Sequence, residues 1–118
     1  MNWIVDFFDS RVMQDVQEWP AGIKAKFLWI AELIEEQGPQ GIGMPYVGAF
    51  GGGLFEIRAK GKEGIGRAIF CILVEKKITI LNAFIKKTQK TPRREIEIAM
   101  KRVKELKNNE QATHLKNF

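Results

Sequence analysis

Cationic side chains gather in one stretch of this sequence, residues 81–94, which reads LNAFIKKTQKTPRR. Two further cations, Arg58 and Arg67, fall on segments whose residue pattern predicts neighbouring strands. The chain carries a net charge of +5, which favours polyanionic partners such as RNA, DNA or an acidic protein. A basic domain with well-solvated lysines would have the same composition. The clustering of the charges therefore has to decide between these interpretations.

The sequence offers few residues for other kinds of site. Cys71 is the only cysteine and lies between Phe70 and Ile72, so it predicts a small core residue without a disulfide. His114, the only histidine, lies in a polar C-terminal segment. Histidine-based metal sites and Ser or Cys activation are therefore not expected. We expect no metal and no small-molecule cofactor.

The bulk composition predicts a single globular domain. Hydrophobic residues make up 45% and charged residues 28% of 118 residues, which is enough to bury a core. No window supplies the roughly 20 apolar residues of a membrane span. The N-terminus lacks the cationic segment and apolar run of a signal peptide. We therefore expect a cytoplasmic protein with no membrane partner.

The first half of the chain predicts a strand followed by a helical hairpin. Residues 3–8 are aromatic and β-branched, as in a short strand. Apolar residues then recur at helical spacing over residues 12–19 and again over residues 23–34. Pro20 bends the chain between the two helices, and Gly38 followed by proline ends the second one.

Residues 40–53 contain GIGMPYVGAFGGG, a glycine-rich segment that lacks the lysine and the strand–turn–helix context of a phosphate-binding loop. We predict a long loop that passes close to the sheet. Tyr46 and Phe50 are interpreted as anchors for this loop, with base stacking as the alternative.

Three strands and a helix follow this segment. Residues 54–60 alternate, so that Glu56, Arg58 and Lys60 share one charged face. Arg67 opens an apolar strand that runs to residue 74, and a tight turn leads into a strand over residues 78–85. Threonine and proline at positions 91 and 92 predict the N-cap and first position of a last helix.

The order of elements predicts an α+β fold. It consists of an N-terminal strand, a helical hairpin, a three-stranded antiparallel meander and a C-terminal helix, with the helices on one face of the sheet. We assign residues 1–107 to the domain and expect residues 108–118, which are polar and lose periodicity, to form a flexible tail.

The runs LFEIRAKGKEGIGRAIF and ITILNAFIKKTQKTPRREIEIA resemble the HigB-type, phage-derived branch of the RelE/ParE toxin superfamily. The similarity spans roughly residues 1–107, and FIKKTQKTP is its most specific part. The resemblance implies a RelE-like fold and the toxin of a type II toxin-antitoxin module, paired with a helix-turn-helix (HigA-like) antitoxin. It further implies a ribosome-dependent endoribonuclease that cleaves mRNA without a metal.

Members of this superfamily place cations on the concave face of the sheet, and the matching positions are Arg58, Arg67 and Lys86. Asn82 stands where relatives commonly have histidine, so this chain cannot use that histidine. Cleavage of RNA by its own 2′-OH needs proton transfer and stabilisation of charge on the phosphate. We expect Arg58 and Arg67 to clamp the phosphate, and Lys86 or Lys60 to transfer protons.

The remaining cations are expected to bind RNA without reading its bases. They would contact mRNA or ribosomal RNA through phosphates, and they are Lys62, Lys87, Lys90, Arg93 and Arg94. Two other functions stay open. One is a non-catalytic inhibitor of DNA gyrase like the ParE branch, and the other is an inactive module that binds an antitoxin and regulates its operon.

Overall fold

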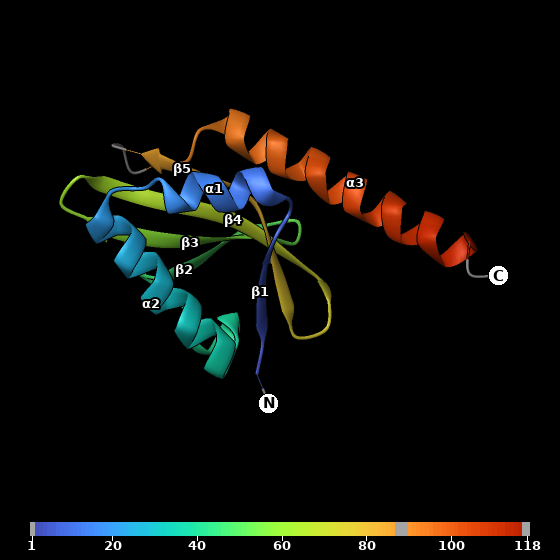
Figure 1. Ribbon diagram of the computed structural model, residues 1–118, viewed down its shortest axis with the longest axis horizontal. Coiled ribbons are helices and arrows are strands. Elements are labelled where there is room, and N and C mark those ends of the chain that lie inside the picture. The colour runs from blue at the N-terminus through green and yellow to red at the C-terminus, as the bar shows by residue number, and fades with distance from the viewer. Residues whose placement is uncertain (1, 87–89, 117–118) are drawn as a thin grey trace.

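The computed structural model describes residues 2–86 and 90–116, with side chains described as far as residue 109. The strands form one sheet in the order β1-β5-β4-β3-β2, and its neighbours are antiparallel except for the parallel pair β1 and β5 (Figure 1). The predicted α+β fold is confirmed. In chain order the elements are β1 (Ile4–Phe7), α1 (Ser10–Gln17), α2 (Ala21–Gln37), a 3₁₀ turn (Pro39–Gly41), β2 (Val47–Gly51), β3 (Leu54–Gly61), β4 (Gly64–Val74), β5 (Lys77–Lys86) and α3 (Arg93–Lys116).

β2 is a strand that the sequence analysis predicted as part of a loop, and that prediction is wrong for Val47–Gly51. The strand pairs with β3 in antiparallel register, with Val47 opposite Ile57, and an irregularity follows Ala49. Backbone hydrogen bonds to β3 do not depend on side chains. A segment of low strand propensity can therefore form an edge strand once its neighbour is in place.

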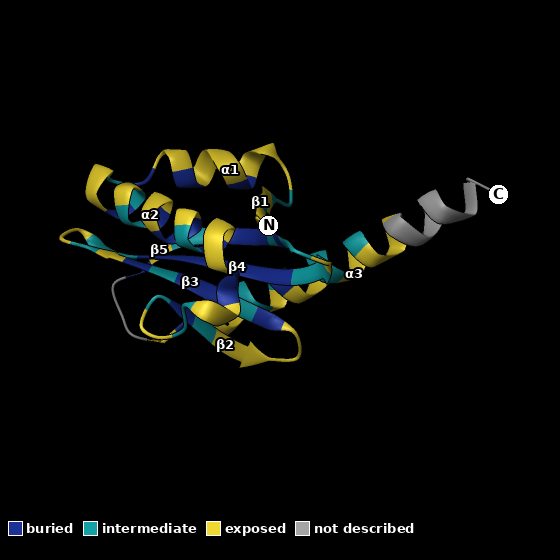
Figure 2. Cartoon of the chain, turned by 90° about the horizontal axis from the view of Figure 1, so that it is seen from below, coloured by how far each residue is buried: buried dark blue, intermediate teal, exposed yellow. Residues whose placement is uncertain are grey.

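α1 and α2 cover one face of the sheet, as the helical hairpin was predicted to do (Figure 2). The α2 side chains Ile23, Phe27 and Ile30 are buried against alternate residues of β3 and β4. Contact is closest at Gly66, where an added Cβ would lie 2.6 Å from Ile23 Cγ2. Glycine at this position lets the helix approach the sheet backbone.

α3 lies on the opposite face, so the prediction that all helices share one face is wrong. Its Ala99 packs with Leu54, Ile69 and Leu81, which belong to a second apolar cluster. Arg102 Nη1 donates to the Leu81 carbonyl oxygen at 2.5 Å. A strand that is apolar on both faces needs a cover on each, and the sequence had already indicated such strands for β4 and β5.

α3 is also longer than predicted: it ends at Lys116, whereas the sequence predicted an end near residue 107. The division into residues 1–107 and 108–118 stays a prediction. Cys71 is buried in the second cluster, as expected from its apolar neighbours. None of the described helices is long and apolar enough to cross a membrane.

Candidate functional site

Strand register brings three of the predicted cations to one face of the sheet. Arg58 of β3 lies directly opposite Arg67 of β4. On the other side of β4, Ile65 is opposite Lys86 of β5, which places Lys86 diagonally from Arg67 on the same face. Because side chains alternate along a strand, all three project away from α1 and α2.

A buried carboxylate, Glu56, holds the two arginines together. Its Oε1 accepts from Arg67 Nη1 at 2.6 Å and lies 2.8 Å from Arg58 Nε. Its Oε2 accepts a hydrogen bond from the Thr91 hydroxyl at 3.0 Å, and the same hydroxyl accepts from Arg67 Nη1 at 3.2 Å. Four side chains from β3, β4 and the segment before α3 thus form one polar network.

Burial makes this network more than a surface ion pair. Arg67 is 1% exposed and Glu56 is 4% exposed, so each charge has lost most of its water. Such a charge is tolerated only when a partner of opposite sign and further hydrogen bonds replace that water. Glu56 also relieves the repulsion between two arginines that face each other across β3 and β4. The Arg58 side chain remains 27% exposed and is the arginine that a ligand can reach.

Lys86 lies at the end of β5 with only 6% of its surface exposed. Among the described residues its Nζ has no hydrogen-bond partner. Burial lowers the pKa of this lysine, and the positive charges of Arg67, Lys90 and Arg58 lower it further, while Glu56 opposes the shift. Crowding by like charges, which the sequence predicted for Lys86, thus acts in the same direction as burial, and burial is the larger cause.

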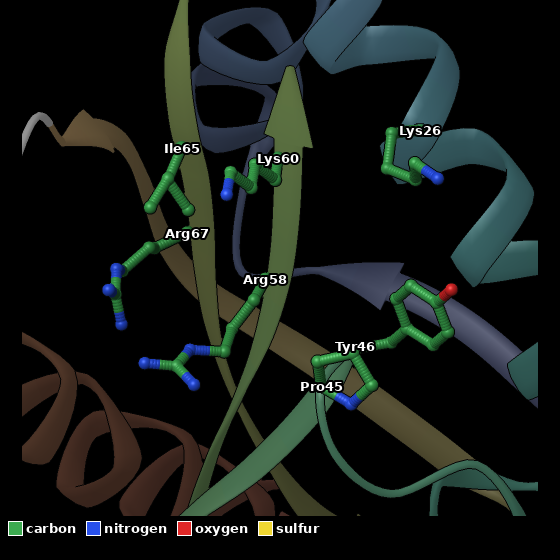
Figure 3. Close-up of a pocket in the computed structure, with 7 residues that line it drawn as sticks. All are labelled: Lys26, Pro45, Tyr46, Arg58, Lys60, Ile65 and Arg67. Atoms are coloured by element: carbon green, nitrogen blue, oxygen red, sulfur yellow. The ribbon is translucent and has the colours of Figure 1, made fainter. Parts of the chain in front are cut away.

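Two hollows open beside the arginines and share both of them. The larger, of about 360 Å³, is lined by Lys26, Pro45, Tyr46, Arg58, Lys60, Ile65 and Arg67. Figure 3 shows the side chains of Arg58, Lys60 and Arg67 directed to one side of the strands, with Lys26 and Tyr46 on the side of α2. The smaller hollow, of about 250 Å³, reaches Phe50 and Thr91 on the other side of Arg58.

The remaining predicted residues lie around this site to different extents. Lys60 lines the larger hollow with the two arginines. Lys62 is exposed in the turn between β3 and β4, and Lys90, Arg93 and Arg94 are exposed at and before the start of α3. Arg93 pairs with Glu97 at 3.5 Å. Lys87 lies outside the described residues.

Sequence reasoning did not predict that Glu56 and Thr91 are buried together in one network with Arg67. Glu56 was placed on the charged face of its strand, but its burial follows from the register that sets Arg67 opposite Arg58. Two arginines facing each other are a signal that an acid lies near, and Glu56 is two residues from Arg58 on the same face. Thr91 was predicted as the N-cap of a helix that in fact begins at Arg93. Its hydroxyl bonds Glu56 and Arg67 instead.

The described residues include no group of three or more His, Cys, Asp or Glu side chains that could hold a metal ion. What the site presents to a ligand is positive charge. Arg58 and Lys60 carry it into the larger hollow, Lys86 Nζ is buried on the same face of the sheet, and Glu56 is occupied by its partners within the protein. Arginine and lysine side chains have the charge and the N–H donors that phosphate oxygens accept from.

Comparisons with known proteins agree with this description. The family described as "Phage derived protein Gp49-like (DUF891)" matches residues 14–104. Among solved structures, a double arginine-to-alanine mutant of the E. coli toxin RelE in the free state is similar with a TM-score of 0.56. The two share 14% sequence identity over 89% of this chain and 98% of the other. No curated protein matches the chain.

At that identity the likeness to RelE establishes the fold, and the family match covers most of the chain. The two comparisons confirm the predicted RelE-like fold of this chain. Its assignment to the HigB-type branch stays a prediction. The chain is a member of the phage-derived Gp49-like family and has a RelE-like fold.

Proposed function

We propose that this protein is the toxin of a type II toxin-antitoxin module and that it cleaves mRNA on the ribosome. The observation that carries the proposal is the joint placement of Arg58, Arg67 and Lys86 around Glu56, beside two open hollows. Family and fold support the toxin, and the cation site supports RNA as its substrate.

The proposed reaction is an internal transfer within RNA. The 2′-oxygen attacks the adjacent phosphorus, a new P–O2′ bond forms, and the P–O5′ bond breaks. The products are a 2′,3′-cyclic phosphate on the upstream fragment and a 5′-hydroxyl on the downstream fragment. One proton leaves the 2′-oxygen and one arrives at the 5′-oxygen, so the reaction needs a proton acceptor, a proton donor and a stabiliser of phosphate charge.

Arg58 is the group placed to stabilise that charge. Its Nε is engaged by Glu56, which fixes the plane of the guanidinium. Its Nη1 lies 3.9 Å from Met44 Sδ, and 27% of the side chain remains exposed. A guanidinium held in this way presents several N–H groups to phosphate oxygens without reorganising. Arg67 is buried and holds Glu56 in place. We therefore assign phosphate contact to Arg58 first and a positioning role to Arg67.

Lys86 is the group placed to move a proton. A lysine with an ordinary pKa stays charged near neutral pH and cannot accept a proton. Burial and the neighbouring arginines lower the pKa of Lys86, which makes its neutral form easier to reach than that of an exposed lysine. Lys86 can then take the 2′-hydroxyl proton or supply one to the leaving oxygen. Lys60, which lines the larger hollow, is the second candidate.

The exposed cations around the site would bind the ribosome and its mRNA. These are Lys62, Lys90, Arg93 and Arg94, and Lys87 is assigned the same role from the sequence alone. Contacts of this kind position the substrate and are weakened by salt. The expected partner that controls the toxin is a helix-turn-helix (HigA-like) antitoxin.

Growth and mRNA integrity after induction test the proposal. Wild type should arrest growth and fragment mRNA, whereas Arg58→Ala and Lys86→Met should each cleave on the order of 100-fold more slowly. Arg11→Ala, which removes an exposed arginine from α1 on the opposite face, should behave as wild type. Arg67→Ala is less informative because it removes a buried ion-pair partner.

Two outcomes would contradict the proposal. Intact mRNA together with DNA damage after induction would indicate inhibition of DNA gyrase. The absence of any growth defect would indicate a module that only binds an antitoxin. Equal cleavage by wild type, Arg58→Ala and Lys86→Met would leave RNA cleavage standing but refute this site.

A further inference from the structure

Beside the arginines, α2 carries a cluster of one cation and two aromatic rings. Lys26 Nζ lies 4.9 Å from the ring centroid of Trp29 and 5.7 Å from that of Tyr46. The two aromatic rings meet edge to face, with centroids 5.2 Å apart and an interplanar angle of 82°. Tyr46 comes from the segment before β2, so this contact ties that segment to α2, as the predicted anchoring role requires.

Anchoring does not account for the exposure of the cluster. Trp29 remains 45% exposed and Tyr46 is half-buried. If Trp29 served only to fix the loop, burying more of its ring would stabilise the folded protein further. The open face of these rings is available to another flat apolar group.

Two members of the cluster, Lys26 and Tyr46, line the hollow of the cation site, and Trp29 packs against both of them. Lys26 and Tyr46 line the same space as Arg58, Lys60 and Arg67, and none of its lining residues is acidic. The backbone N–H of Arg58 donates to the Tyr46 carbonyl oxygen at 2.8 Å, which ends the pairing of β3 with the β2 segment. Beyond Arg58 the hollow passes round the edge of β3 from the arginines to α2 (Figure 3).

We propose that Trp29 and Tyr46 form a second nucleotide subsite for single-stranded RNA. In this subsite a base stacks on the exposed ring of Trp29, which Tyr46 supports edge to face, and the phosphate beside the base lies between Lys26 and Lys60. Aromatic rings beside a cationic groove are the combination that binds single-stranded nucleic acid without reading its sequence. The inference extends the proposed function, because it assigns a place to a nucleotide that flanks the phosphate held at Arg58.

Charge and shape favour RNA over a peptide as the occupant. A peptide would be held by the aromatic rings or by the lysines, but its backbone offers no charge repeated at each unit. A nucleic-acid strand offers a base and a phosphate at every step, which matches a hollow lined by several cations with aromatic rings at one end of it. An acidic peptide as the true ligand is therefore an outcome that the experiment has to separate.

Binding of two oligonucleotides by the purified chain tests the subsite. The probe is a fluorescein-labelled single-stranded RNA of about ten nucleotides, with 2′-O-methyl riboses that block cleavage. The comparison strand has the same phosphates but abasic positions at its centre. Wild type should bind the base-bearing strand on the order of 5- to 100-fold more tightly than the abasic strand. Fluorescence anisotropy gives both affinities for each variant.

The ratio of the two affinities assigns the stacking residue. Trp29→Ala should bring the ratio close to one, and Trp29→Phe should retain most of it. Leu28→Ala removes the neighbouring exposed side chain on α2 and should leave the ratio unchanged. Lys26→Ala should weaken both strands by a similar factor. Because the ratio is taken within one variant, partial unfolding lowers both affinities and does not imitate the loss of stacking.

Several results would overturn the inference. These are no measurable binding by wild type, equal affinity for both strands, a ratio that Trp29→Ala leaves intact, or binding of poly-glutamate as tight as that of RNA. Failure of the proposed function looks different. A protein that prefers the base-bearing strand but leaves mRNA intact in cells would retain this subsite and refute the cleavage. If wild type cuts mRNA in cells but Trp29→Ala leaves the affinity ratio unchanged, the cleavage stands and this subsite is refuted.

Discussion

Replacing Glu56 by glutamine tests the network that holds the site. The substitution keeps the size of the side chain and removes its charge, which leaves the 1% exposed Arg67 without the carboxylate at 2.6 Å. Breaking a buried ion pair by removing one partner costs about 3–5 kcal/mol. A domain of this size has a free energy of unfolding of about 5–15 kcal/mol. Glu56→Gln should therefore lose a large part of the stability while remaining folded at low temperature.

The expected loss corresponds to a fall in Tm of roughly 10–20 °C, at about 4 °C per kcal/mol for a domain of this length. Calorimetry and urea denaturation at neutral pH measure it. The matched control is Glu63→Gln, which removes an exposed carboxylate from the turn between β3 and β4. That variant should stay within about 0.5 kcal/mol of wild type.

A double-mutant cycle separates the pair from general damage to the core. Arg67→Met alone leaves Glu56 buried with a weaker set of partners, so it should also destabilise the protein. Once one charge of the pair is gone, removing the other relieves a buried charge that has lost its closest ionic partner. The double variant Glu56→Gln/Arg67→Met should therefore lose clearly less than the sum of the two single losses. A loss below about 1 kcal/mol for Glu56→Gln, or simple additivity, would refute the role given to this network.

Two further substitutions test the packing of the site. Lys86→Met should raise the Tm at neutral pH, because it removes a buried ammonium with no hydrogen-bond partner among the described residues. Burial and Arg67 lower the pKa of Lys86, so the folded state binds fewer protons than the unfolded state. Wild type should therefore regain stability relative to Lys86→Met as the pH rises toward the ordinary pKa range of lysine. A gap in Tm that is constant with pH would argue against a lowered pKa. Gly66→Ala should cost about 1–3 kcal/mol, because its Cβ would meet Ile23 at 2.6 Å. Gly22→Ala, with its nearest atom at 3.6 Å, should be neutral or slightly stabilising, and equal urea midpoints for the two glycine variants would contradict the close contact.

Periodicity predicted the central elements of the fold because their side chains report directly on burial. The apolar runs of β4 and β5 and the stripes of α1 and α2 are fixed by the surfaces they cover. β2 was not predicted because the edge strand Val47–Gly51 is held by backbone hydrogen bonds to β3. Such bonds do not require a pattern of apolar residues in the edge strand itself. The position of α3 on the opposite face could have been inferred, because strands that are apolar on both faces need other elements to pack on each face.

The cations of the site could be predicted from the sequence, but the side chains that surround them could not. Arg58, Arg67 and Lys86 came from strand alternation and from the resemblance, and strand pairing places them together. The burial of Glu56 depends on which residue of β4 faces Arg58, and that register cannot be read from either strand alone. The Trp29–Tyr46 contact joins α2 to the segment before β2, and no local pattern links two such distant segments.

The measurement that most directly tests the account is a map of mRNA ends after brief induction of the chain. Wild type should produce new 5′-hydroxyl ends within translated regions, and blocking translation should remove them. Arg58→Ala should yield far fewer such ends at equal protein level, and Arg11→Ala should yield as many as wild type. New ends that carry a 5′-phosphate, or no new ends in cells that stop growing, would contradict RNA cleavage by 2′-hydroxyl attack at this site.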